Sequence, residues 1–171
     1  MNQEYEKQVR YQFENANIVF TEKEIKNIEF ADFGLNNIEI EGLNLIVYIN
    51  ENGYCAKEMV LLPHQTCPEH IHPNLVNEPG KIETFRCRKG KVFLYVEGES
   101  NPNHIKATIP QGKEDFYTVF HEIQLHPGEQ YTIPSNTKHW FQSGSKGAVI
   151  SEFSTTSRDE LDIFTDTNVV R

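Results

Sequence analysis

The strongest constraint on the fold is a series of short apolar or alternating runs between residues 37 and 155. Glycine, proline and asparagine separate the runs, and the intervals leave no room for helices that connect parallel strands. This spacing favours an antiparallel barrel or a double-sheet jelly roll and disfavours a βαβ fold. The runs cover 37–42, 43–50, 54–62, 82–88, 91–98, 104–109, 117–125, 129–133, 138–144 and 147–155.

The sequence before these runs has a different character. Residues 1–30 are amphipathic and predict short helices, one of which starts at a capping box formed by Thr21 and Glu24. We therefore expect a helical segment, residues 1–36, packed on a barrel formed by residues 37–171. A chain of 171 residues suits a single domain that combines both parts.

Two segments are expected to lie outside the regular strands. Residues 98–115 are the part of the interior with most loop character. The polar tail from Ser154 to Arg171 contains Ile163 and Phe164, which need cover from water. We expect this tail to pack back over the barrel.

Charge and composition exclude several classes of partner. The formal net charge is −9, which argues against surfaces for nucleic acid or anionic lipid, since both require clustered lysine and arginine. Neither a membrane span nor a secretory signal is expected, because the chain lacks a long apolar run and an apolar N-terminal stretch. Cys55, Cys67 and Cys87 do not have the spacing of a disulfide framework or a thiolate metal site, so a cytoplasmic location is expected.

A histidine pair and a glutamate suggest a metal site. His70 and His72 are two residues apart and would share one face of a strand. Glu83 shares its face with Phe85 and Cys87, so its carboxylate points toward an apolar interior. Burial of a carboxylate is costly unless it is paired or binds a cation.

A third histidine strengthens this interpretation. His139 follows a proline-containing turn and shares its face with Phe141, which also points inward. Three imidazoles and one carboxylate suit Mn, Fe, Co, Ni or Zn as the divalent ion. The alternative is that these are ordinary polar side chains, which is how we interpret the remaining histidines: His64, His104, His121 and His126.

The spacing resembles the two motifs of the cupin superfamily. The first motif falls at His70, His72, Glu83 and Gly90, and the second at Pro134 and His139. Two departures stand out. The insertion at residues 73–82 is longer than in many cupins, and Asn136 replaces the usual glycine of the second motif.

More closely, the chain resembles the short, single-domain bacterial D-lyxose isomerases. The resemblance is most specific at residues 61–73, 81–99, 126–134, 139–142 and 149–166. It implies a mostly β, single cupin-type jelly-roll barrel, a divalent metal (usually manganese), a homodimer, and interconversion of D-lyxose with D-xylulose. D-mannose and D-fructose are further candidate substrates.

Aldose–ketose isomerisation by a cis-enediol requires a base, and Glu152 is the first candidate. It shares a face with Ile150 and Ser154 on an otherwise apolar strand, and it matches a position that the isomerase family uses for acid/base work. Lys81 is the second candidate, because it precedes Glu83 by two residues. The alternatives are a strand-end or arginine-paired carboxylate and a solvated loop lysine. A hydride shift would require no base.

Weaker candidates for contact with the sugar are Lys57, His64, Glu69, His121, Trp140, Arg158 and Asp159. Of these, we expect Glu69 to be a surface carboxylate, with a partner of a metal ligand, reached from a neighbouring turn, as the alternative. Trp140 alternates away from His139, so we expect it to serve packing.

Two other functions remain open at this point. An iron-dependent cupin dioxygenase would use the same ligands, and a non-catalytic cupin would bind metal or sugar without turnover. An inward acid/base such as Glu152 favours the isomerase, because oxygen chemistry does not require it.

Overall fold

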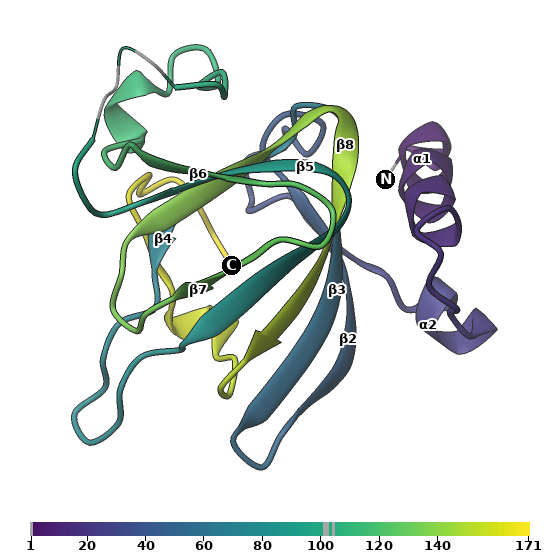
Figure 1. The fold of residues 1–171 in the computed structure, drawn as a ribbon, viewed down its shortest axis with the longest axis horizontal. Helices are drawn as coiled ribbons and strands as arrows, with labels where there is room; N and C mark the ends of the chain where they lie inside the picture. The colour runs from purple at the N-terminus through teal and green to yellow at the C-terminus, as the bar shows by residue number, and fades with distance from the viewer. Residues whose placement is uncertain (1, 101–102, 104) are drawn as a thin grey trace.

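The computed structural model describes residues 2–100, 103 and 105–171 and shows antiparallel strands curled into a barrel, with helices against one side (Figure 1). The elements are α1 (Gln3–Glu14), α2 (Glu22–Lys26), β1 (Glu29–Ala31), β2 (Leu43–Glu51), β3 (Tyr54–Leu61), β4 (Thr66–Ile71), β5 (Glu83–Val96), the 3₁₀ turn η2 (Glu114–Phe116), β6 (His121–Leu125), β7 (Gln130–Ile133), β8 (His139–Ser154), the 3₁₀ turn η3 (Asp159–Leu161) and β9 (Ile163–Phe164).

Two long strands, β5 and β8, hold the barrel together. They pair with each other along most of their lengths. The C-terminal half of β8 also pairs with β3, which continues to β2 and β1, while its N-terminal half pairs with β4, which continues to β9. Strands β6 and β7 add to the other edge of β5. Because both long strands bend from one sheet into the other, they bring side chains of both sheets to one interior.

The sequence runs at 82–88 and 91–98 belong to the single strand β5, and those at 138–144 and 147–155 fall in β8. The bend lies where Gly90 of β5 meets Gly147 of β8. Gly90 has a φ of 77°, and a Cβ there would collide with the carbonyl oxygen of Gly147. Only glycine allows this close approach without strain, so the bend requires a glycine at position 90.

Two predicted strands are wrong. Residues 37–42 form a turn in which the N–H groups of Ile40 and Glu41 both donate to the Asn37 carbonyl. The predicted strand at 104–109 begins at His104, which lies outside the described residues, and residues 105–109 form no strand. Side chains of β5 and β8, not another strand, bind the backbone N–H groups there.

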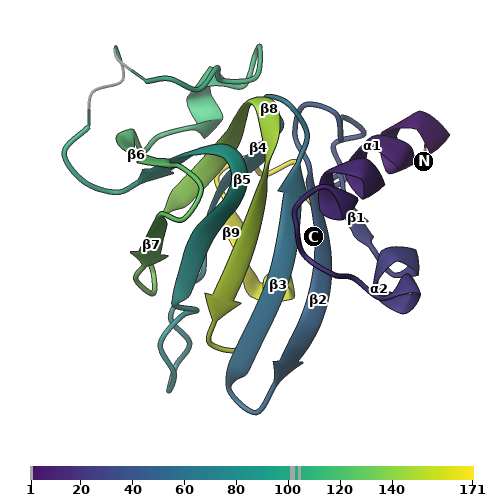
Figure 2. The same ribbon diagram turned by 45° about the vertical axis from the view of Figure 1, so that its right-hand side comes forward.

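The helices cover the outer face of the barrel. Tyr5, Val9 and Phe13 of α1 are buried in a cluster with Val60 of β3 and Val149 of β8. Burial of each such side chain stabilises the fold by about 1.5–3 kcal/mol. Figure 2 shows α1 on the outside of the barrel, beside β2 and β3.

The capping box predicted at the start of α2 is present. Thr21 Oγ1 accepts a hydrogen bond from the Glu24 N–H, and the Glu24 carboxylate accepts one from the Thr21 N–H. The division between a helical segment at 1–36 and a barrel at 37–171 stays a prediction. None of the helices in the described part of the chain has the length and hydropathy to cross a bilayer.

The C-terminal tail returns to the barrel. Strand β9 pairs with β4, so that Phe164 lies opposite His70 and packs against the barrel core. Ile163 is more exposed than expected, at 57% of its surface. The tail therefore supplies one wall beside the histidines of β4.

Candidate active site

Four predicted ligands come together inside the barrel. His70 lies on β4, His72 directly follows that strand, Glu83 starts β5 and His139 starts β8. All four side chains are buried, and their potential ligand atoms lie within 4.8 Å of one another. The antiparallel pairing of β4 with β8 places His70 opposite His139, which explains how residues so far apart in the sequence meet.

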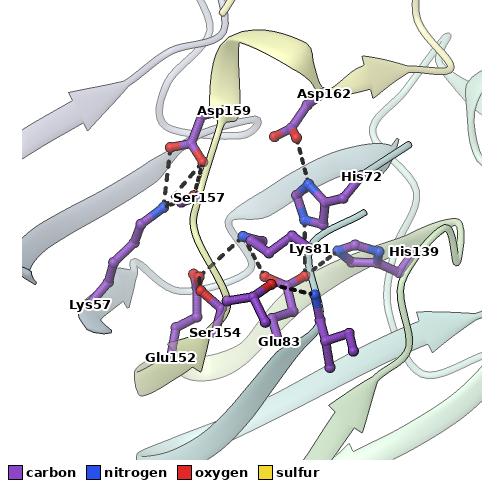
Figure 3. A network of polar contacts seen from close by, with 12 residues as sticks. Lys57, His72, Lys81, Glu83, His139, Glu152, Ser154, Ser157, Asp159 and Asp162 are labelled. Carbon is purple, nitrogen blue, oxygen red and sulfur yellow. Dashed lines mark hydrogen bonds and ion pairs between the residues drawn. The ribbon is translucent and has the colours of Figure 1, made fainter. Parts of the chain in front are cut away.

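Each histidine is held through its Nδ1 atom. In His70 and His139, Nδ1 lies 2.8 Å and 2.9 Å from the backbone carbonyl two residues earlier. In His72, Nδ1 lies 2.5 Å from the Asp162 carboxylate (Figure 3). Since these partners are acceptors, each Nδ1 carries the proton and donates it, and the Nε2 atoms are left for a ligand.

The Glu83 carboxylate lies between two of these rings. Its Oε1 atom is 3.1 Å from His72 Nε2 and 2.9 Å from His139 Nε2. The Nε2 atom of His139 is buried and has no hydrogen-bond partner among the described residues. A buried nitrogen in this state, beside a carboxylate and further imidazoles, fits a site for a borderline divalent cation.

Charge shifts the pKa values of these groups. Burial raises the pKa of Glu83, but the charges of Lys81 and His72 outweigh it and hold that pKa well below its usual range. Burial lowers the pKa of His72, but the Glu83 charge opposes this and brings the value to about 9. The pKa of His70 falls well below its usual value because of burial and the neighbouring histidines.

Lys81 links the ligand cluster to a second carboxylate. Its ammonium lies 2.6 Å from Glu83 Oε2 and 3.1 Å from Glu152 Oε1 (Figure 3). Burial lowers the pKa of Lys81, but the two carboxylates raise it well above its usual value. Lys81 is therefore a stable cation. Strand β5 begins only at Glu83, so Lys81 reaches the site from the loop that precedes the strand.

Glu152 points into the same interior. It lies on β8, is 3% exposed, and accepts a hydrogen bond of 3.0 Å from the Ser154 hydroxyl. Lys57 is its register partner on β3 and donates to Ser157 and to Asp159 of the tail. The site thus contains two ammonium groups, of Lys57 and Lys81, each beside one or two carboxylates.

The cavity between these groups is small, about 30 Å³. Lys57 and Lys81 line it and reach across to carboxylates. Its lining combines the four polar groups His70, His72, Lys81 and Glu83 with apolar side chains such as Met59 and Phe85. A polar molecule that entered here would exchange hydrogen bonds with the two lysines.

Other candidates lie away from the cavity. His64 and His121 are exposed on the surface. Arg158 pairs with an exposed glutamate. Trp140 is fully buried and stacks on Tyr95 with ring centroids 4.0 Å apart, as expected for a packing residue.

The expectation that Glu69 lies at the surface is wrong. Its side chain is buried and accepts hydrogen bonds from Thr118, Val119 and Thr165. These donors belong to the segment before β6 and to the C-terminal tail, neither of which is adjacent in sequence. Glu69 thus holds these two segments, by hydrogen bonds, against β4, the strand that carries His70.

Sequence reasoning missed Asp162 and Phe164. Phe164 stacks on the His70 ring with centroids 5.3 Å apart, and Asp162 holds His72. The signal for Asp162 was a carboxylate beside the apolar pair at 163–164 in a tail expected to pack on the barrel. The sequence did not indicate that Asp162 would contact His72 rather than another histidine.

Comparison with known proteins decides the family. Residues 18–171 match the family described as D-lyxose isomerase. The chain belongs to that family. It is 62% identical over 159 residues to the D-lyxose ketol-isomerase of Cohnella laeviribosi, covering 93% of this chain and 87% of that relative. It is 57% identical over 169 residues to the D-lyxose/D-mannose isomerase of Thermosediminibacter oceani, covering 98% and 92%.

Solved structures with a similar fold are more distant in sequence. The L-ribose isomerase of Acinetobacter sp. DL28 aligns with a TM-score of 0.80 at 17% identity, covering 99% of this chain and 94% of that one. The L-ribose isomerase of Cellulomonas parahominis aligns with a TM-score of 0.79 at 16% identity, covering 98% and 94%. At such low sequence identity, these similarities concern the fold alone. The predicted mostly β, single barrel with short N-terminal helices is confirmed.

Proposed function

We propose that this protein is a metal-dependent aldose–ketose isomerase that interconverts D-lyxose and D-xylulose. The observation that carries the proposal is the bridge made by Lys81 between Glu83, in the ligand cluster, and Glu152, a buried carboxylate outside it. Metal-assisted ketol isomerisation through a cis-enediol uses these groups together: a cation site, a base and a donor to the sugar oxygens.

His70, His72, Glu83 and His139 would hold the divalent ion, with three Nε2 atoms and one carboxylate oxygen as ligands. When bound, such an ion polarises a carbonyl and stabilises the negative charge that develops on the sugar oxygens. Manganese is the first choice from the family resemblance, with Fe²⁺, Co²⁺, Ni²⁺ and Zn²⁺ as alternatives.

Glu152 would act as the base. In the forward direction its carboxylate takes the proton from C2 of the aldose and returns it to C1, through a cis-enediol, while the hydroxyl proton of O2 passes to O1. The Ser154 hydroxyl and the Lys81 ammonium both donate to one carboxylate oxygen, Oε1. These two donors orient the group and leave its other oxygen, Oε2, to face the sugar.

Lys81 would act as a fixed donor. Because its pKa is raised, it keeps its proton and does not serve as a base. Its ammonium can donate to a sugar oxygen next to the carbon that loses its proton, and so stabilise charge there. Lys57, the register partner of Glu152, and Asp159 also line the cavity, where they would contact hydroxyl groups farther along the sugar.

D-mannose is a further candidate substrate, with D-fructose as its product. It has the same configuration as D-lyxose at C2, C3 and C4 and adds one hydroxymethyl group. The name of the Thermosediminibacter oceani relative includes both sugars. The added group would meet the wall near Lys57 and Asp159, which decides how well the hexose fits.

We also propose a homodimer in the cytoplasm. The dimer is supported by the family resemblance. The location is supported by three cysteines that are buried and free, as in a reducing compartment.

The test is to incubate the manganese-loaded protein with D-lyxose in heavy water and follow products by NMR, with an oxygen electrode in parallel. We expect D-xylulose, deuterium at C2 of recovered D-lyxose, and no oxygen uptake. Turnover without deuterium would favour a hydride shift over Glu152 as base. Oxygen uptake would favour the dioxygenase, and saturable binding without turnover would favour a non-catalytic cupin.

A further inference from the structure

The three histidines of the ligand cluster are anchored in two different ways. His70 and His139 donate from Nδ1 to a backbone carbonyl two residues earlier, so their ring orientation is set within their own stretch of chain. His72 has its Nδ1 atom 2.5 Å from Oδ1 of Asp162, which is 90 positions later in the chain. His72 is thus the one member of this trio whose Nδ1 is held by a distant side chain.

Asp162 is well placed for this contact. It lies between η3 and β9, in the C-terminal tail that passes beside β4 (Figure 3). Its side chain is 9% exposed and that of His72 is 7% exposed, so water competes little for the hydrogen bond. The pairing of β9 with β4 sets Ile163 opposite Ile71, which brings the preceding residue, Asp162, level with His72.

We propose that Asp162 is a positioning residue for the metal site. Its carboxylate accepts the Nδ1 proton of His72, holds that ring in one orientation and tautomer, and directs Nε2 toward the ion. Carboxylate partners of metal-bound histidines also raise the electron density of the ring, which strengthens the ligand bond. The inference rests on the metal site of the proposed function.

The expected effect follows from this role. Loss of such a partner weakens metal binding by about 10–100-fold. An asparagine side chain at this position would still offer a neutral acceptor oxygen, so Asp162→Asn should lose less affinity than Asp162→Ala. A purely structural role for the tail would not produce this order.

Asp166 provides the matched control. It lies in the same tail, is also buried, and pairs with Lys113 and Asn168 rather than with a histidine. Asp166→Asn removes one charge from the tail without touching His72. All three tail variants are checked by circular dichroism before any metal is added.

The experiment measures Mn²⁺ affinity by calorimetric titration and the visible spectrum of the Co²⁺-loaded protein. We expect Asp162→Ala to weaken Mn²⁺ binding by about 10–100-fold and to change the Co²⁺ spectrum, with Asp162→Asn intermediate and Asp166→Asn within about threefold. If Asp162→Ala does not fold, Asp162→Asn alone carries the comparison.

Three results would overturn the inference. Equal Mn²⁺ affinity and Co²⁺ spectra in the Asp162 variants and the unsubstituted protein would show that His72 needs no partner. An equal loss in Asp166→Asn would assign the effect to the tail as a whole. Failure of the unsubstituted protein to bind Mn²⁺ or Co²⁺ would overturn the proposed metal site together with the inference. In the first two results the unsubstituted protein still binds the ion, so only the role of Asp162 fails.

Discussion

The ammonium group of Lys81 lies 3.1 Å from Oε1 of Glu152. The same ammonium lies 2.6 Å from Glu83, so one buried cation separates two buried carboxylates. Without it, the two negative charges would face each other at low dielectric, which is strongly unfavourable. Lys81 therefore has both an electrostatic role in the site and a position next to the candidate base.

Replacement of Lys81 by methionine, which has a similar shape and no charge, should lower kcat by about 10²–10⁴-fold, because a donor to the sugar oxygen is lost. Steady-state kinetics on D-lyxose measure this. Lys89→Met on β5, outside the cavity, is the control and should keep kcat within about twofold. A Lys81→Met protein that folds and retains kcat within about tenfold would remove Lys81 from the mechanism.

Replacement of Glu152 by glutamine should lower kcat by about 10²–10⁴-fold, since the amide cannot take the C2 proton. Mn²⁺ affinity should stay within about threefold, because Glu152 is outside the ligand cluster. Glu58→Gln is the matched control. Glu58 is buried on the neighbouring strand β3 but accepts from Ser151 on the other face of the sheet. Its substitution should leave kcat unchanged, and an equal loss in both variants would contradict the assignment.

Replacement of Trp140 by phenylalanine should affect stability and not sugar binding. The indole N–H donates to the Val119 carbonyl at 2.8 Å, and the ring is fully buried. Loss of this bond and of packed volume should cost about 1–3 kcal/mol of unfolding free energy, measured with urea. A KM for D-lyxose raised about tenfold at unchanged stability would instead indicate contact with the sugar.

Asp159 should make stability depend on pH. Burial raises its pKa, but the charge of Lys57 outweighs this and lowers the pKa from its usual value. A carboxylate with a lowered folded-state pKa stabilises the fold above its unfolded pKa of about 3.9, and the contribution is lost as pH falls from that value through the folded-state pKa. The unfolding free energy of wild type minus that of Asp159→Asn should therefore shrink by about 1 kcal/mol between about pH 7 and about pH 3. A difference that grows toward acid pH would contradict this, provided that circular dichroism shows both proteins folded at the start.

The ligand cluster was predictable because it depends on short-range rules. Alternation along a strand places Glu83 with Phe85, and His139 with Phe141, on inward faces, and all four of these residues are buried. Burial of a carboxylate there limits the possible explanations to pairing or a cation. The resemblance to D-lyxose isomerases then favoured sugar isomerisation over the other reactions that such a metal site could support.

Other features depend on contacts that sequence spacing does not record. Residues 105–109 resemble a strand, but Tyr95 and Gln142 side chains satisfy their N–H groups. Glu69 resembles a surface residue until the tail and the segment before β6 fold over it. The partner of His72 depends on how the tail docks, which is a tertiary outcome.

The central claim is that a single divalent ion in the ligand cluster supports isomerisation of D-lyxose. The most direct measurement is a titration of the metal-stripped protein with Mn²⁺, in which bound ion and the rate of D-xylulose formation are recorded in the same samples. The account predicts that the metal-stripped protein is inactive and that the rate rises in proportion to bound ion, to a plateau at about one ion per chain. Full activity without metal, or one tightly bound ion that brings no D-xylulose, would contradict it.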